Sequence, residues 1–79
     1  MKIVSYDECM KVLLNGGFIH EFLDGINTKY ELLNSDERIV GSVSLDTWLS
    51  LKCYDFCKVN GKGTPGYSTY YRLNCVDIY

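Results

Sequence analysis

The chain has 79 residues and a net charge of −2, and 47% of its residues are apolar and 14% aromatic. This composition excludes a disordered chain and indicates one small domain over residues 1–79, which buries only about 60% of the surface exposed on unfolding. No stretch is long and apolar enough to predict a membrane helix, and no hydrophobic signal segment opens the chain, so we expect a cytoplasmic protein.

The two halves of the chain differ in charge. Residues 1–46 contain four basic and eight acidic side chains, whereas residues 47–79 contain four basic and two acidic ones. Such an imbalance arises by chance in some small domains, and in others it serves partners of opposite charge. Both interpretations stay open at this point.

The first predicted element is a helix that begins after Ser5. Ser5 and Glu8 have the spacing of a capping box, in which each side chain satisfies a backbone donor of the other residue. The spacing of the next apolar residues predicts a buried side made of Cys9, Met10, Leu13 and Leu14. Asn15, Gly16 and Gly17 follow, and glycine favours the left-handed conformation that ends a helix.

Three strands are predicted next, over residues 18–23, 28–33 and 38–43. Asp24 and Gly25 mark the first turn, which Ile26 and Asn27 are expected to lengthen beyond two residues. In the second strand Tyr30 and Leu32 share one face. Residues 1–43 are therefore expected to form a helix followed by a three-stranded meander.

Residues 44–79 are expected to form a second helix and a hairpin. Ser44 is the predicted helix cap, and the predicted buried face consists of Leu45, Trp48, Leu49 and either Leu51 or Cys53. Strands over 56–60 and 67–73 flank a glycine-rich turn at 61–66, and residues 74–79 either add an edge strand or lie against the body. The predicted fold is α+β, in the order α-β-β-β-α-β-β, with an antiparallel sheet and two short helices.

The sequence contains no recognisable catalytic set, so we expect a protein without enzymatic activity, cofactor or metal. His20 is the single histidine and alternates with Phe18 and Phe22, which favours a packed structural role. The four cysteines, at positions 9, 53, 57 and 75, lack zinc-site spacing and are expected to be reduced thiols. The 61–66 turn joins strands and lacks the features of a phosphate loop.

Residues 44–73 resemble the C-terminal half of winged-helix domains. Residues 44–52 correspond to the recognition helix, and residues 56–60 and 67–73 to the two wing strands. The resemblance implies DNA binding by a transcriptional regulator, with phosphate contacts from Lys58, Lys62 and Arg72. That family has two helices before the recognition helix, whereas this chain has a meander there. A related alternative is that unpaired bases stack on tyrosines, namely Tyr54, Tyr67, Tyr70 and Tyr71.

Protein binding is the other predicted function. Tyr70 and Arg72 share one strand face and are residue types that are enriched at interface centres. Acidic side chains around the first hairpins are expected to form a partner-binding face: Glu21, Asp24, Glu31, Asp36 and Glu37. The chain is small, forms a single domain of mixed α+β order, contains cysteines and lacks a catalytic set, and in these properties it resembles phage-encoded anti-CRISPR proteins. This resemblance implies a stoichiometric inhibitor of a host protein or ribonucleoprotein complex.

Overall fold

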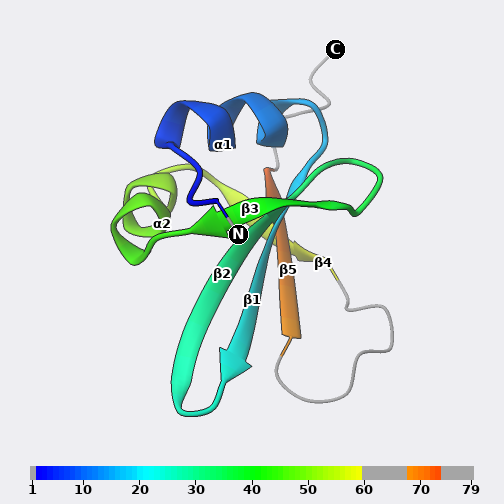
Figure 1. Cartoon of the computed structure of the whole chain (residues 1–79). Helices are drawn as coiled ribbons and strands as arrows, with labels where there is room; N and C mark the ends of the chain where they lie inside the picture. Colours follow the sequence, from blue (N-terminus) through cyan, green and yellow to red (C-terminus); the bar gives the residue numbers. More distant parts are fainter. Residues whose placement is uncertain (1, 60–67, 74–79) are drawn as a thin grey trace.

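The computed structural model describes residues 2–59 and 68–73 and confirms the predicted α+β fold and its element order (Figure 1). Each predicted element is present, and the strand bounds agree with the expected ones to within about one residue. The elements are α1 (Tyr6–Leu14), β1 (Phe18–Asp24), β2 (Asn27–Leu33), β3 (Ile39–Val43), α2 (Leu45–Leu51), β4 (Phe56–Val59) and β5 (Ser68–Leu73). The predicted turn at 61–66 and the predicted terminal segment 74–79 lie outside the described residues.

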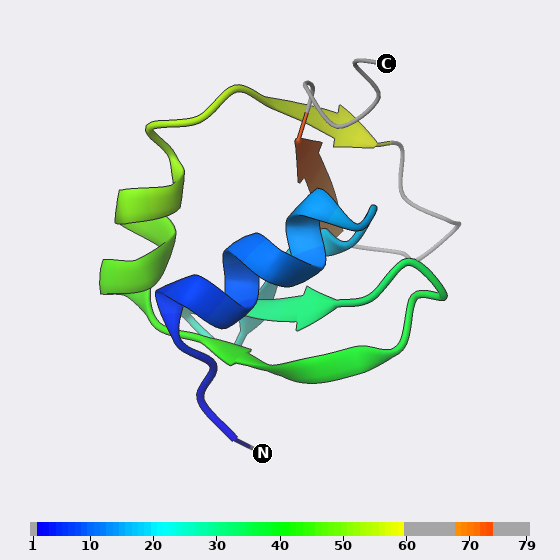
Figure 2. The ribbon, with the colours of Figure 1, turned by 90° about the horizontal axis from the view of Figure 1, so that it is seen from above.

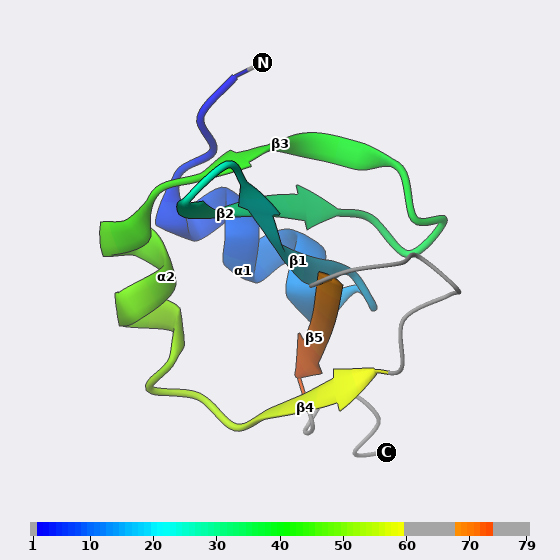
Figure 3. The same cartoon turned by 90° about the horizontal axis from the view of Figure 1, so that it is seen from below.

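The five strands form one antiparallel sheet in the order β3-β2-β1-β5-β4. The β4–β5 hairpin belongs to this sheet, because β5 pairs with β1 along four residue pairs. β3 and β4 are therefore the two edges, and α2 is the connection that carries the chain from one edge to the other (Figure 3). This connection places α2 beside residues from both halves of the chain.

The Ser5 half of the predicted capping box at the start of α1 is confirmed, because the Ser5 hydroxyl accepts a hydrogen bond from the Glu8 backbone N–H at 3.2 Å. The Glu8 carboxylate pairs with Lys2 Nζ at 2.9 Å. Gly16 has a φ of +90°, the left-handed conformation expected after a helix. The prediction for Leu14 was wrong: its side chain is 54% exposed, because Leu13 already points into the core.

The β1–β2 hairpin is tighter than predicted. Asp24 and Asn27 are paired across the strands, so the loop contains only Gly25 and Ile26. Gly25 occupies the first loop position with a φ of +68°, as a two-residue turn with glycine in that place requires. The expectation of a longer loop was therefore wrong, and Ile26 projects from the tip, 97% exposed.

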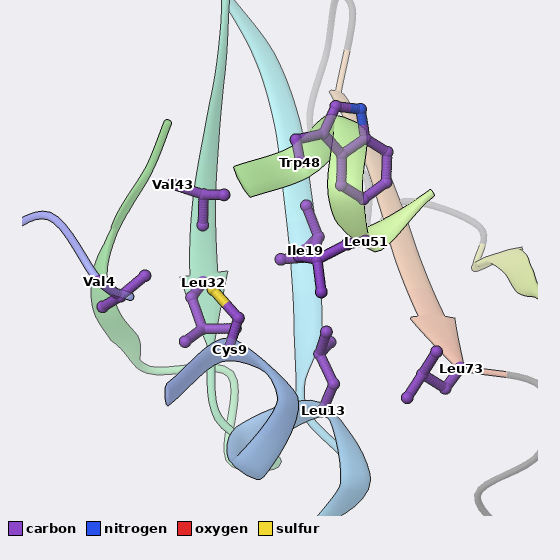
Figure 4. Close-up of a cluster of buried hydrophobic side chains, with 9 residues drawn as sticks. All are labelled: Val4, Cys9, Leu13, Ile19, Leu32, Val43, Trp48, Leu51 and Leu73. Atoms are coloured by element: carbon purple, nitrogen blue, oxygen red, sulfur yellow. The ribbon is translucent and has the colours of Figure 1, made fainter. Parts of the chain in front are cut away.

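The core lies between one face of the sheet and the two helices (Figure 2). Ile19 and Leu32 come from the central strands, and Leu13 of α1 packs on them. Trp48 is 3% exposed, which confirms its predicted place in the core (Figure 4). The buried cluster contains Val4, Cys9, Leu13, Ile19, Leu32, Val43, Trp48, Leu51 and Leu73.

α2 is rotated relative to the sequence prediction. Its buried residues are Trp48 and Leu51, whereas Leu45 and Leu49 are 59% and 54% exposed. The prediction was therefore right for Trp48 and Leu51 and wrong for Leu45 and Leu49, and Cys53, the alternative to Leu51, is exposed. A helix of seven residues has room for few core contacts, and the sheet takes the side chains of Trp48 and Leu51. Neither helix in the described part of the chain has the length and hydropathy needed to cross a membrane.

Candidate functional site

The five acidic residues predicted to form one face are distributed over four places. Glu21 lies on the sheet face that carries the helices, because it is paired with Tyr30, and Glu31 lies on the opposite face, paired with His20. Asp24 is at the tip of the first hairpin, 3.3 Å from Lys29 Nζ. Asp36 and Glu37 lie in the turn between β2 and β3. Their role in partner binding remains a prediction.

The predicted wing residues are also separated. Lys58 is paired with Tyr71 and Arg72 with Cys57, so the side chains of Lys58 and Arg72 point to opposite faces of the β4–β5 ribbon. Tyr70 shares the face of Arg72, as predicted, but its ring stacks on another residue of the sheet. Lys62 lies outside the described residues.

The residue on which the Tyr70 ring stacks is His20, on the sheet face away from the helices. Its Nδ1 lies 2.9 Å from Glu31 Oε1, and its ring is stacked on Phe22 and Tyr70 with centroid distances of 5.1 and 4.4 Å. The His20 Nε2 atom is buried and has no hydrogen-bond partner among the described residues. The predicted packed role of His20 is confirmed by these contacts.

Glu21 is the centre of a hydrogen-bond network on the helix side of the sheet. The Tyr30 hydroxyl donates to Oε2 at 2.9 Å, and the Tyr71 hydroxyl donates to Oε1 at 3.2 Å. Burial, followed by the bond to Glu21, raises the pKa of Tyr30 to about 12, and burial with the nearby Glu21 charge also raises the pKa of Tyr71. Both tyrosines therefore remain hydrogen-bond donors at neutral pH.

Four aromatic rings pack beside this carboxylate. The Trp48 ring lies 5.2 Å from Tyr30, 5.1 Å from Tyr71 and 5.4 Å from Phe56, centroid to centroid. Lys52 Nζ lies 5.9 Å from the centre of the Trp48 ring, which is a cation–π distance. The negative face of the indole thus already attracts one cation of the chain itself.

A cavity of about 300 Å³ opens next to these groups. Its aromatic walls come from Trp48, Phe56 and Tyr71, with the partly exposed Tyr54 beside them. Its charged groups are Glu21, Lys52 and Asp55. The cavity therefore combines apolar walls with two carboxylates and one ammonium group, and we call it the Glu21 cavity.

α2 also carries two exposed leucines. Leu45 and Leu49 are more than half exposed, whereas Trp48 of the same helix is buried and lines the Glu21 cavity with Lys52. Positions 45 and 49 are four residues apart, so their side chains lie on the same side of the helix. α2 therefore presents an exposed apolar pair in addition to its contribution to the cavity wall.

The thiols have different environments. Cys9 is fully buried, and burial raises the pKa of its thiol to about 11, so it stays protonated at neutral pH. Cys53 is exposed and Cys57 is half-buried, and all three are free thiols, while Cys75 lies outside the described residues. Within residues 2–59 and 68–73, no group of three or more His, Cys, Asp or Glu side chains is placed to hold a metal ion.

The Glu21 cavity as a unit was missed by sequence reasoning. The sequence prediction for Glu21 rests on its charge alone, Trp48 is predicted only as a core residue, and Tyr71 only as a candidate for stacking with bases. One usable signal was present: Lys52 follows Trp48 by four residues, which places its ammonium group over the ring. The pairing of β5 with β1, which brings Tyr71 next to Glu21, depends on a contact distant in sequence.

The fold and the cavity define a small α+β domain with a five-stranded antiparallel sheet, two short helices and an aromatic cavity beside α2. Comparison with protein-family models, with curated proteins and with solved structures finds no match to this chain.

Proposed function

We propose that this protein is a non-enzymatic binding protein of the host cytoplasm that acts as a stoichiometric inhibitor of a host protein or ribonucleoprotein complex. The observation that carries the proposal is the surface of α2. Leu45 and Leu49 are both more than half exposed, and the same helix contributes Trp48 and Lys52 to the Glu21 cavity. Exposed apolar side chains on an element that also lines an aromatic cavity with a few charged groups are typical of a surface that a partner covers.

The side chains best suited to acid–base catalysis, His20 and Glu21, are engaged in structural contacts, which supports binding over catalysis. Nδ1 of His20 is paired with Glu31, and its ring is held between two aromatic rings. Both oxygens of Glu21 accept tyrosine hydroxyls. Groups fixed in this way give a rigid, preorganised surface, which lowers the entropic cost of binding a partner.

The resemblance in size and style to phage-encoded anti-CRISPR proteins supports an inhibitory role. A small domain inhibits a large complex by covering one of its surfaces, and it needs only one rigid patch for that purpose. α2 offers two exposed leucines, and the Glu21 cavity offers the partly exposed Tyr54 and charged groups of both signs. This combination fits a non-obligate interface better than a permanent one.

The experiment has two stages. First, the tagged protein is used to capture partners from a bacterial lysate with and without nuclease, and the captured protein is purified. Second, its activity is titrated with this chain. A stoichiometric inhibitor abolishes activity at a fixed molar ratio, whereas inhibition at far below one equivalent would indicate an enzyme and would refute the proposal. The variant with Leu45→Ser and Leu49→Ser should lose capture while remaining folded.

A DNA-binding regulator is the second candidate, and the basic excess of residues 47–79 favours it. Under this hypothesis, Lys58→Glu combined with Lys62→Glu should abolish binding to DNA, and binding should weaken steeply with salt. DNA binding that survives both substitutions would exclude the wing as the contact. Capture of nucleic acid alone, lost after nuclease treatment, would place this candidate first.

A further inference from the structure

The Glu21 cavity contains the groups that recognise an organic cation. Trp48, Phe56 and Tyr71 provide ring surfaces, and Glu21 and Asp55 provide negative charge. Aromatic faces carry a negative electrostatic potential, and indole is the strongest cation–π partner among the side chains. Walls of this kind with carboxylates beside them favour a positively charged guest over a neutral one.

The state of Glu21 strengthens this argument. Each of its oxygens accepts one tyrosine hydroxyl, which fixes the carboxylate in place. An ionised carboxylate has about four acceptor sites, so two hydrogen bonds leave acceptor capacity for a guest. Hydrogen bonds to an ionised carboxylate are stronger than neutral ones, and a carboxylate that is already fixed loses little side-chain freedom when they form.

The position of Lys52 independently indicates that the Glu21 cavity favours a positively charged group. Its ammonium group lies 5.9 Å from the centre of the Trp48 ring, at the wall of the cavity. Lys52 is itself exposed, so its long side chain can move away into water without breaking the core. The chain therefore places one of its own cations, reversibly, where a partner's cation would bind.

We propose that the Glu21 cavity binds the guanidinium group of an arginine side chain presented by a partner protein, and that this group displaces Lys52 from Trp48. The proposal rests on the proposed function and names the chemistry of the partner's contact. A guanidinium is planar, stacks on aromatic faces and donates two parallel hydrogen bonds to a carboxylate, which matches the walls and the fixed Glu21. An ammonium group fits the rings but lacks the planar fork.

The test uses small probes and the intrinsic fluorescence of Trp48, the single tryptophan of the chain. The protein is titrated with N-acetyl-arginine methylamide, with the lysine analogue, and with the citrulline analogue, which has nearly the same shape without the charge. The arginine probe should change the Trp48 emission saturably, the lysine probe should bind more weakly, and the citrulline probe should leave the emission unchanged. Equal responses to arginine and citrulline, or none to arginine, would overturn the proposal, and tighter binding of lysine would overturn its guanidinium part.

Single substitutions separate the contributions of Glu21 and Lys52 to binding of the arginine probe. Glu21→Gln should weaken arginine binding about tenfold or more, because a charge-assisted hydrogen bond is lost. Lys52→Met should tighten it about two- to fivefold, because the competing cation is removed. Asp7→Asn is the matched control for charge, since Asp7 is an exposed acid of α1 that does not line the cavity. If Glu21→Gln does not fold, the gain in Lys52→Met still decides the question.

The two proposals fail in distinguishable ways. If the chain captures no partner but still binds the arginine probe, the inhibitory function is wrong and the cavity is correctly assigned. If partner capture is unchanged in Glu21→Gln while the probe does not bind, the cavity proposal is wrong and the inhibitory function remains.

Discussion

His20 and Glu31 face each other across β1 and β2, with Nδ1 2.9 Å from Oε1, on the sheet face that carries no helix. Each side chain is only 13% exposed, although nothing in the described residues packs over this face as a helix would. The stacked rings of Phe22 and Tyr70 provide the cover. A one-residue shift between β1 and β2 would send His20 and Glu31 to opposite faces, so this pair favours the observed register.

Removing one partner of this pair should cost more than removing both. Glu31→Val leaves the His20 N–H without its acceptor, and we expect a loss of about 1–3 kcal/mol of unfolding free energy. The double variant His20→Phe with Glu31→Val replaces both polar groups by apolar ones and should be close to neutral. Urea unfolding of His20→Phe, Glu31→Val and the double variant measures the coupling. Additive losses would show that the contact contributes nothing.

The rotation of α2 can be tested by a matched pair of substitutions. Leu51 is fully buried, and Leu51→Ala should cost about 2–5 kcal/mol. Leu49→Ala removes the same atoms from a side chain that is 54% exposed, and should change stability by less than about 1 kcal/mol. Thermal unfolding compares the two. The reverse order of losses would mean that α2 presents the other face to the sheet.

Trp48 should be essential for stability. It contacts three other aromatic rings and is 3% exposed, so Trp48→Ala should cost about 3–5 kcal/mol, enough to unfold a domain with marginal stability. Trp48→Phe keeps part of the contact area and should retain the fold. In the native protein the Trp48 emission should be blue-shifted relative to unfolded chain. A water-like emission maximum would place the indole at the surface.

The order of elements could be predicted because local signals agree with it. Ser5 and Ser44 cap the helices, Gly16 ends the first one, and alternation of apolar residues marks the strands. The rotation of α2 could not be predicted from the same signals. Leu45, Trp48 and Leu49 form an apolar set with the i, i+3, i+4 spacing, and only tertiary packing decides that Trp48 and Leu51 enter the core while the two other leucines stay exposed.

The candidate site was predictable only in part. The charge of Glu21 is visible in the sequence, but its network requires Tyr71, which is 50 residues away and is brought near by the pairing of β5 with β1. The predicted acidic residues do not form a single face for a related reason. The register of β1 and β2 places Glu21 and Glu31 on opposite sides of the sheet. A list of charges contains no information on register.

Gly41 should tolerate no side chain. The N-terminal segment pairs with β3 through a hydrogen bond from the Ser42 N–H to the Lys2 carbonyl oxygen at 2.7 Å. A Cβ at position 41 would lie 2.7 Å both from that carbonyl oxygen and from Val4 Cγ1, which is closer than side chains approach. Gly41→Ala should therefore release the segment or shift β3, at a cost of about 1–3 kcal/mol. Hydrogen exchange at the Val4 and Ser42 amides should accelerate, and unchanged protection would contradict the close contact.

The fold should lose stability in alkaline solution through buried groups that resist ionisation. Burial raises the pKa of Cys9 from its ordinary value of 9.0 to about 11, and burial with the bond to Glu21 raises that of Tyr30 from 10.0 to about 12. Above pH 9 the unfolded chain releases the Cys9 proton while the folded chain still holds it, so the unfolded state binds fewer protons and becomes favoured as the pH rises. The contribution of Cys9 is therefore fully present below pH 9 and is lost by about pH 11, and that of Tyr30 is lost between about pH 10 and 12.

Urea unfolding between pH 8 and 11 measures this effect. Cys9→Ala should flatten the decline that begins near pH 9, and Tyr30→Phe should flatten the part that begins near pH 10, because each variant removes one of the titrating groups. Each variant is compared with its own stability at pH 8, since both also lose packing or a hydrogen bond at every pH. A stability that stays level up to pH 11 would mean that Cys9 ionises in the folded protein as readily as in water, and would place its thiol outside the core cluster in solution.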